Sequence, residues 1–465
     1  MKRFTIFVLL SVTAAALRAQ SVTQTEAMQR ASRYYNEHVR PAGLRSTAEA
    51  EPAAVTPWMA GDTTCMYAVQ MDGGGWVLVS ADDRTTASVL AYSENGIFDT
   101  GDMPDGMRWL MDMYASQIQE VKNSTDSVPT PTQGGFRKQK TENISGSDIY
   151  SPGNYLLKID GQEILWGQST NNENTCLNSY NALCPECDGK NCDCGRCDAG
   201  CGPVALAMVM RYWQWPPSAA IPTTPGGDEK VARFYDWEKM PYQIDSKTPN
   251  ESALAIAGLL RDCGYTAESS YKKNYTLTWR REMVDALEAF YYHTNNWEVR
   301  LGTDWDDRIR NEINQGRPVL YNGGPHWFVI DGYQHDPDLI DYFHLNIGWN
   351  GLYNAYYTLS HIVTEDNDNF TAAQVAIMGV YPDCNKYIIN GSILHLTESG
   401  IVKSVPNRPI HTKLQVSLNN RVEYIVPSIE LLPGTEIELG SSLDIQIAPA
   451  YQFCNTRGPG NIKEK

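Results

Sequence analysis

The sequence predicts an α+β fold, because segments with helical spacing precede segments with strand character in the central part of the chain. Apolar residues recur at helical intervals over 203–213, near 252–262 and over 279–290. Short apolar runs with strand character follow at 318–321, 327–331, 342–347 and 355–359. The chain has 465 residues, which is too long for one ordinary core, so we expect about two to four domains.

Residues 1–19 have the pattern of a secretory signal peptide. A basic head, Met1–Arg3, precedes the apolar stretch 4–16, and Leu17–Ala19 offers a small-residue cleavage site. That stretch is shorter than the ~20 residues of a membrane span, and no later segment is apolar for long enough. We therefore expect a protein without a membrane span that is secreted, periplasmic or on the cell surface, where disulfides persist.

The composition is that of a globular protein with an acidic surface. Hydrophobic residues make up 42% of the chain and charged residues 20%. The formal net charge is −17 at pH 7, and such a surface repels phosphate backbones. We therefore expect no nucleic-acid partner.

Residues 20–123 have the pattern of a small α+β domain. Helical spacing over 24–35 is followed by strand-like runs at 67–71 and 75–80, which a glycine-rich turn joins. A second amphipathic helix begins at Pro104, with apolar residues on one face. We list that face as Met107, Leu110, Met111, Tyr114 and Ile118.

Residues 124–151 have almost nothing to bury, so they predict an exposed linker. The basic residues Arg137, Lys138 and Lys140 make this linker an accessible site for an activating cleavage, and a passive tether is the alternative. Residues 152–384 then hold every candidate for catalysis. Residues 385–465 show short alternating runs between turn residues, which predict a small all-β C-terminal region.

Cys201 is the best candidate for a nucleophile. Gly200–Pro203 lead directly into the apolar segment 204–210, so the cysteine lies at the start of a buried helix. The helix dipole and the free N–H groups of the first turn favour a thiolate at this position. The chain has 11 cysteines, and an odd number leaves at least one thiol unpaired in an oxidising compartment.

A histidine and an asparagine complete a candidate catalytic set. His326 precedes the strand-like run 327–331, and Asn346 and Trp349 lie further along the chain. Cysteine, distant histidine and then asparagine is the order of a papain-type thiol hydrolase. His326 would hold the thiolate as an ion pair, Asn346 would orient the imidazole, and Trp349 would shield their contact. Taken singly, each residue has an ordinary alternative in a core or a turn, and His344 is a rival base.

Gln168 is a candidate donor to the oxyanion that forms during acyl transfer. Its side chain and the backbone N–H of Cys201 would together stabilise the negative oxygen. An ordinary surface glutamine is the alternative interpretation. We further expect Trp349 and Gly324 to contact the substrate.

A cluster of cysteines lies between residues 176 and 197. Its members are Cys176, Cys184, Cys187, Cys192, Cys194 and Cys197. In a secreted chain the cluster favours three disulfides, while a zinc site or a mixture of the two stays open. Either arrangement makes a stapled insertion between Gln168 and Cys201, close to the substrate cleft. The other histidines show no metal-ligand spacing, and we expect no cofactor and no functional metal.

From about residue 20 to 384 the chain resembles the streptopain family of secreted bacterial cysteine peptidases, a branch of the papain-like clan. The segment 75–84, followed by 91–93, resembles the family's inhibitory propeptide. Gly200–Cys201 with the helix after it resembles the nucleophile helix, and 326–332 resembles the histidine strand. Residues 346–351 resemble the Asn-Trp-Gly-Trp-Gly-Gly signature of the family.

The resemblance implies a zymogen with a papain-like catalytic domain behind an α+β propeptide. It implies that Cys201 is the nucleophile, His326 the base and acid, Asn346 the orienting residue and Gln168 the oxyanion donor. The partners would be protein or peptide substrates and the chain's own propeptide, which would block the cleft until the linker is cut.

The chain also departs from the family pattern. Ile347 replaces the first tryptophan of the signature, and Pro325 replaces the usual glycine before the histidine. The cysteine cluster is additional, and Cys201–Pro203 is also similar to the start of the bacteriocin-leader peptidases. These departures leave two alternatives open: an inactive papain-like binding or adhesion protein, and a thiol amidohydrolase that acts on non-protein amides.

Overall fold

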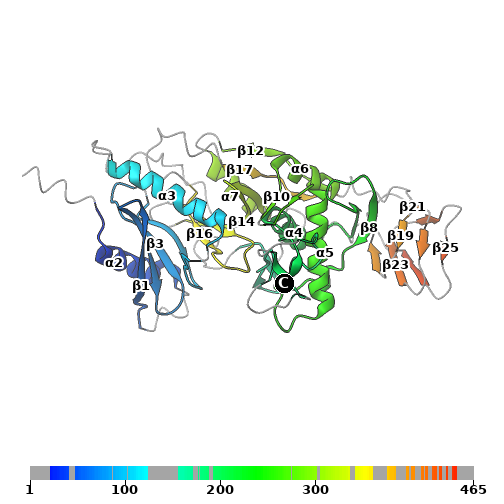
Figure 1. Ribbon diagram of the computed structural model, residues 1–465, viewed down its shortest axis with the longest axis horizontal. Coiled ribbons are helices and arrows are strands. Elements are labelled where there is room, and N and C mark those ends of the chain that lie inside the picture. Colours follow the sequence, from blue (N-terminus) through cyan, green and yellow to red (C-terminus); the bar gives the residue numbers. More distant parts are fainter. Residues whose placement is uncertain are drawn as a thin grey trace, which may run out of the picture. The chain divides into compact units, whose positions relative to one another are not determined.

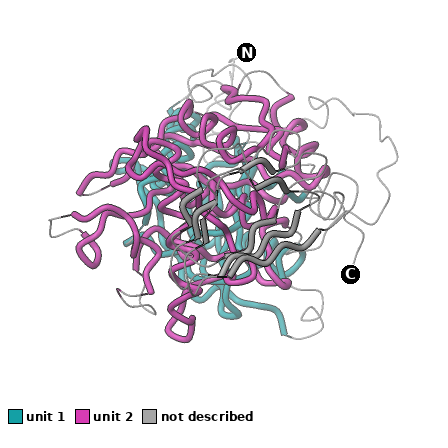
Figure 2. Tube along the Cα trace, turned by 90° about the vertical axis from the view of Figure 1, so that its right-hand side faces the viewer, with its two compact units in different colours: residues 1–154, 333–344, 353–371 teal, residues 155–332, 345–352, 372–465 magenta. Residues whose placement is uncertain are grey.

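The computed structural model describes residues 21–40, 48–85, 87–101, 103–123, 155–170, 176, 178–187, 192–273, 275–300, 304–335, 341–359 and 374–383, and the backbone of short strands within 394–447. The expected signal peptide and the expected linker lie outside the described residues. The chain divides into two compact units, each assembled from segments that are discontinuous in sequence (Figure 2). Unit 1 contains residues 1–154, 333–344 and 353–371, and unit 2 contains residues 155–332, 345–352 and 372–465.

Unit 1 is built around an antiparallel sheet (Figure 1). Its strands pair in the order β1 (Pro52–Ala60), β2 (Thr63–Met71), β3 (Trp76–Ser80), β4 (Val89–Ser93) and β16 (Ala355–Tyr357). Its helices are α2 (Gln24–Tyr34), the π-helix η1 (Tyr35–Val39) and α3 (Asp105–Asn123). The strand β16 is distant in sequence from β4, yet Tyr356 lies opposite Tyr92 in their ladder.

The helices of unit 1 begin and pack as their sequences require. Thr23 and Glu26 form a reciprocal capping box at the start of α2, and the small residues Ala27 and Ala31 let this helix lie close to the sheet. All residues of β3 and β4 are buried, as expected for strands covered on both faces. The apolar face predicted for the helix that begins near Pro104 is buried in α3, which confirms that prediction.

Unit 2 combines helices with a second group of antiparallel strands. Its helices are α4 (Cys201–Trp213), α5 (Asn250–Thr266), α6 (Arg280–Ala289) and α7 (Trp305–Asn314). Within the group, β14 (His326–His335) pairs with β13 (Val319–Gly323), β13 with β17 (Gln374–Ile377), and β17 with β12 (Trp297–Val299). The strand β15 (Asp341–Asn346), like β14, has residues in both units.

Shorter elements complete the described part of unit 2. They are β5 (Lys158–Ile159), β6 (Gln162–Glu163), η3 (Asp193–Gly195), β7 (Ser218–Pro222), β8 (Lys230–Phe234), η4 (Trp237–Lys239), β9 (Ser270–Tyr271), β10 (Thr276–Leu277), β11 (Tyr292–His293) and β18 (Tyr381–Pro382).

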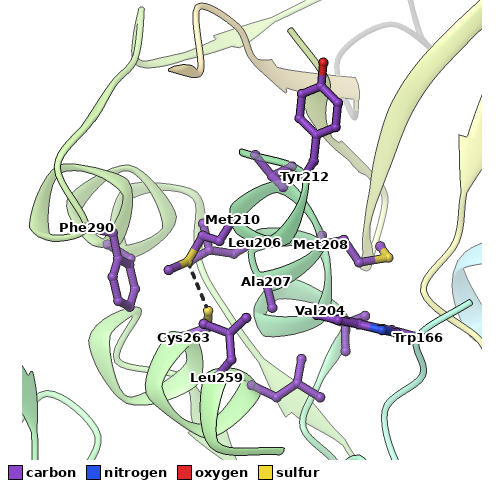
Figure 3. Close-up of a cluster of buried hydrophobic side chains, with 14 of the residues drawn as sticks. Trp166, Val204, Leu206, Ala207, Met208, Met210, Tyr212, Leu259, Cys263 and Phe290 are labelled. Carbon is purple, nitrogen blue, oxygen red and sulfur yellow. Dashed lines mark hydrogen bonds between the residues drawn. The ribbon is translucent and has the colours of Figure 1, made fainter. Parts of the chain in front are cut away.

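The central helix of unit 2 is α4, which is buried on all sides from Gly202 to Trp213. Figure 3 shows its side chains among Leu259 and Cys263 of α5 and Phe290, the residue that ends α6. The thiol of Cys263 lies 3.5 Å from the sulfur of Met210. Because the first turn of this helix carries Cys201, the core of unit 2 fixes the position of that cysteine.

The described C-terminal segments are all strands. They are β19 (Leu394–Leu396), β20 (Gly400–Lys403), β21 (Ile410–Thr412), β22 (Leu414–Val416), β23 (Arg421–Val426), β24 (Ile429–Leu431), β25 (Glu436–Ile437) and β26 (Ser442–Ile447). Each sheet is parallel and joins every third strand, as in β20, β23 and β26. This is the strand pattern of a short β-solenoid.

The fold class expected from the sequence is confirmed. The predicted central helices correspond to α4, α5 and α6, and the predicted strands correspond to β13, β14, β15 and β16. The helix α7 was not predicted from the sequence, because its only buried apolar residues are Trp305 and Ile309. Among the described helices, none combines the length and the apolar character needed to cross a membrane.

Candidate active site

Cys201 is the first residue of α4, and the chain can turn there because two glycines flank it. Gly200 has a φ of 93°, a backbone conformation that residues other than glycine rarely adopt. A Cβ atom on Gly202 would lie 2.6 Å from Cβ of Thr278, so only glycine fits beside that threonine. The cysteine residue as a whole is partly exposed, although it packs against the core of unit 2.

His326 begins β14, directly after the hairpin turn that leaves β13. Gly324 has a φ of 58° at the first position of this two-residue turn, and the exposed Pro325 occupies the second. The backbone N–H of Trp327 donates to the sulfur of Cys201 over 3.3 Å. The described geometry therefore brings Cys201 and His326 together although they are far apart in sequence.

The electrostatics at this pair favour a thiolate. Burial raises the pKa of the Cys201 thiol, but the charge and the hydrogen bond of His326 lower it, as do the backbone N–H groups of Trp327 and Gly202. The lowering contributions prevail, so the pKa lies below that of an ordinary thiol. A low pKa at a partly exposed cysteine is the property of a reactive thiol.

The imidazole of His326 is oriented by a backbone carbonyl. Its Nε2 lies 2.9 Å from the oxygen of Ile347, and the ring is buried. A carbonyl oxygen can only accept, so Nε2 carries a hydrogen and Nδ1 is the nitrogen left to exchange a proton with the sulfur.

Asn346 is fully buried and fixes the loop that supplies this carbonyl. Its Nδ2 donates to the carbonyl of Ile164 over 2.7 Å, and its Oδ1 accepts from the N–H of Gly348 over 3.2 Å. A Cβ atom on Gly348 would lie 2.9 Å from Cγ1 of Val204, so the loop packs directly on α4. The amide thus holds the backbone on both sides of Ile347.

Gln168 lies beside the segment that leads to the nucleophile. Its carbonyl accepts from the N–H of Ala199 over 2.8 Å, and its side chain is buried. The adjacent Trp166 carbonyl accepts from the N–H of Asn350 over 3.1 Å. This second contact ties the glutamine segment to the loop that contains Trp349, whose side chain is half-buried.

The structure shows further contacts around Cys201 and His326 that no sequence pattern indicates. Trp327 donates its indole N–H to the carbonyl of Thr278 over 3.0 Å, and Asn322 donates to the carbonyl of His326 over 3.1 Å. No local pattern marks these residues, because their roles arise only when distant segments pack. The rival base His344 is buried in unit 1, where its ring packs edge-on against Tyr356 with centroids 5.0 Å apart.

The cysteine cluster forms two disulfides, Cys176–Cys194 and Cys187–Cys192. These sulfurs are therefore not zinc ligands, and no group of potential metal ligands occurs among the described residues. The third disulfide expected from the sequence is not formed, because Cys184 and Cys197 are buried free thiols. Burial chiefly raises the pKa of Cys184, to about 12.

Comparison with known proteins gives two family matches. Residues 174–357 match the Peptidase C10 family, and residues 19–118 match the Spi protease inhibitor. Thiol protease/hemagglutinin PrtT of Porphyromonas gingivalis is 25% identical over 397 residues, which cover 80% of this chain and 43% of PrtT. The chain therefore spans less than half the length of that relative.

Streptopain of Streptococcus pyogenes serotype M1 is 25% identical over 351 residues, which cover 68% of this chain and 81% of streptopain. A solved fragment of prointerpain A from Prevotella intermedia covers 70% of this chain and 99% of its own length, with 23% identity and a TM-score of 0.49. The two family matches and the similarity to streptopain confirm the expected enzyme class, and the family matches confirm the order of the inhibitor and peptidase regions. Residues 174–357 of this chain therefore match the Peptidase C10 family, to which they are similar as a thiol protease region, and a region that matches the Spi protease inhibitor precedes them.

Proposed function

We propose that the protein is a secreted endopeptidase that cleaves peptide bonds in proteins through a Cys201–His326 pair. The contact between the sulfur of Cys201 and the N–H of Trp327, beside a buried imidazole that lowers the pKa of the thiol, carries this proposal. The signal-like residues 1–19 support export.

In the proposed reaction, the thiolate of Cys201 attacks the carbonyl carbon of the scissile bond. The backbone N–H of Cys201 and the side chain of Gln168 stabilise the oxygen as it becomes negative. His326 then protonates the leaving amine, which leaves a thioester on Cys201. His326 next removes a proton from water as the oxygen attacks the thioester carbon. Cleavage of the C–S bond then releases the carboxylic acid product and restores the thiolate of Cys201 beside the protonated imidazole.

Asn346 is the proposed orienting residue, and it acts through the loop that it anchors. Its two backbone hydrogen bonds hold Ile347 so that the carbonyl can accept from Nε2 of His326. Trp349 and Gly324 are proposed to contact the substrate, because both lie in the turns that flank the imidazole.

The Spi-type region is proposed to inhibit the peptidase until the 124–151 linker is cut. An inhibitor region in the same chain keeps a general protease inactive during export. Zymogen organisation also favours protein substrates over small amides, because an enzyme for small amides needs no such safeguard.

Replacement of Cys201 by alanine tests the proposal. Wild-type full-length protein should cleave itself within 124–151 and then cleave casein, and Cys201→Ala should lose at least about 10⁴-fold of both activities. N-terminal sequencing locates the first cleavage, and iodoacetamide labelling with mass mapping reports the reactive thiol.

Cys65→Ala is the matched control, because Cys65 is a buried free thiol whose pKa is raised chiefly by burial. This variant should keep wild-type labelling and activity. Self-cleavage by pure Cys201→Ala at the wild-type rate would refute the mechanism.

A further inference from the structure

The segment Gln168–Thr170 is held at every residue by the polypeptide between Tyr180 and Ala199. The N–H of Tyr180 donates to the carbonyl of Ser169 over 3.3 Å, and that of Ala199 donates to the carbonyl of Gln168. The Ser169 side chain hydrogen-bonds the carboxylate of Asp198.

Thr170 is held by a second carboxylate of the same polypeptide. Its backbone N–H donates to Oδ2 of Asp193 over 3.3 Å, and its hydroxyl donates to the same oxygen. The carboxylates of Asp198 and Asp193 therefore accept hydrogen bonds from the two residues that follow Gln168.

The position of Asp193 is unusually well fixed. It lies between Cys192 and Cys194, each of which is covalently joined to a different cysteine, Cys187 and Cys176. The Asp193 carbonyl also accepts from Nδ2 of Asn181 over 3.2 Å. Disulfides on both sides of one residue restrict its backbone far more than one cross-link would.

Asp198 links the same segment to the nucleophile. Its carbonyl accepts from the hydroxyl of Thr276 over 2.6 Å, and a Cβ atom on the nearby Gly200 would lie 2.7 Å from Cγ2 of that threonine. Burial and the charge of Asp193 raise the pKa of the Asp198 carboxyl to about 6, and the hydrogen bond from Ser169 opposes them.

Negative charge destabilises a thiolate, so we do not assign these two carboxylates a direct part in the chemistry of Cys201. Their observed contacts are with the backbone and hydroxyl groups next to Gln168. We propose that Asp193 and Asp198 are positioning residues, and that the disulfide-stapled insertion exists to hold Gln168 where the oxyanion forms. This inference rests on the proposed function, because it requires Gln168 to be an oxyanion donor.

The first test is a set of variants of the full chain, assayed after maturation for kcat and KM on a peptide substrate. Asp193→Ala should lower kcat about tenfold or more, with little change in KM, because a slightly misplaced donor stabilises the transition state poorly. Asp193→Asn should restore most of kcat, since an amide oxygen can accept the same two hydrogen bonds.

Glu186→Gln is the matched control. Glu186 is a carboxylate of the same insertion whose side chain is 86% exposed and lies 3.9 Å from Arg196. Its loss should leave kcat unchanged, as expected for a weak surface ion pair.

Two further measurements separate positioning from general damage. Alkylation of Cys201 by iodoacetamide forms no oxyanion, so its rate in Asp193→Ala should equal that of the wild type. The double variant Gln168→Ala with Asp193→Ala should be no slower than Gln168→Ala alone, because the carboxylate acts only through the glutamine.

Three results would each overturn the positioning role. They are additive losses of kcat in the double variant, a wild-type kcat in Asp193→Ala, and slower alkylation of Cys201 in Asp193→Ala. Failure of the proposed function would look different. In that case the wild type would lack peptidase activity, or Gln168→Ala alone would keep full kcat, and the positioning role would fall with it.

Discussion

The inhibitor region in unit 1 and the nucleophile helix in unit 2 are held by different kinds of contact. In unit 1, strand β4 of the inhibitor region pairs with β16 of the peptidase region, and the rings of Tyr92 and Tyr356 stack with centroids 5.3 Å apart. In unit 2, the residues around α4 are mostly aliphatic side chains and methionines (Figure 3). The first contact resembles a protein interface and the second a permanent core.

Hydrogen bonds from tyrosine hydroxyls add to the contact within unit 1. Within unit 1, Tyr114 donates to the carbonyl of Thr358 over 2.6 Å, and Tyr342 donates to that of Val89 over 2.8 Å. Each joins the inhibitor region to a segment that follows residue 332. Tyrosine buries a ring but keeps a polar end, which suits a surface that becomes exposed in the proposed activation. If the proposed activation holds, we expect the zymogen to separate in unit 1 and to stay intact in unit 2.

The largest effect that we expect concerns the core of unit 2. Leu206→Ala should lower the free energy of unfolding by about 2–5 kcal/mol, because Leu206 is fully buried in α4 and its loss leaves a cavity. Thermal unfolding of the full chain measures this change.

Leu254→Ala on α5 is the control, since Leu254 is 36% exposed, and it should change stability by less than about 1 kcal/mol. Equal effects of the two substitutions would mean that α4 is not the centre of the core.

The sequence predicted the centre of the fold for a physical reason, and it indicated the two side chains that are proposed to react. The apolar run 204–210 after Gly200–Cys201 indicated a buried helix, and the order of Cys201, His326 and Asn346 indicated the peptidase class. A local pattern of this kind predicts structure well because burial and helix geometry determine which residues it contains.

Contacts between distant segments were beyond local patterns. The carbonyl of Ile347 and the packing of Thr278 on Gly202 have no signature in composition or spacing. The parallel C-terminal sheets do correspond to a pattern along the chain, since Gly400, Arg421 and Ser442 begin paired strands at a constant spacing.

A second prediction concerns the charge that distinguishes Cys201 from other thiols of unit 2. Burial chiefly raises the pKa of Cys263 well above that of an ordinary thiol, whereas the pKa of Cys201 is lowered. Alkylation of Cys201 should therefore rise with pH through a midpoint below the ordinary value of about 8.5 and then level off.

His326→Gln should move that midpoint above about 8.5, because burial then raises the pKa of the thiol without an imidazolium to lower it. A shift of one pKa unit corresponds to about 1.4 kcal/mol. The measurement is the rate of iodoacetamide labelling between pH 5 and about pH 10. An unchanged midpoint in the variant would show that the backbone N–H groups, not the imidazole, lower the pKa.

The smallest expected effect tests the interface in unit 1. Tyr342→Phe removes only the hydroxyl that donates to Val89, and it should weaken retention of the inhibitor region by about 1 kcal/mol, or several-fold in Kd. The experiment uses full-length Cys201→Ala protein cut in the linker by an added protease, followed by size-exclusion chromatography at increasing dilution.

In this experiment the two fragments of the parent should elute together to a lower concentration than those of Tyr342→Phe. Ile97→Ala is the control, because Ile97 is 70% exposed, and it should match the parent. If the fragments of every variant stayed together at all dilutions, the tyrosine contacts of unit 1 would belong to a permanent core like that around α4. If the fragments of all variants instead separated at the same concentration as those of the parent, the Tyr342 hydroxyl would contribute nothing to retention. The inhibitor region would then be held by the backbone hydrogen bonds of the β4–β16 ladder, which no side-chain substitution removes.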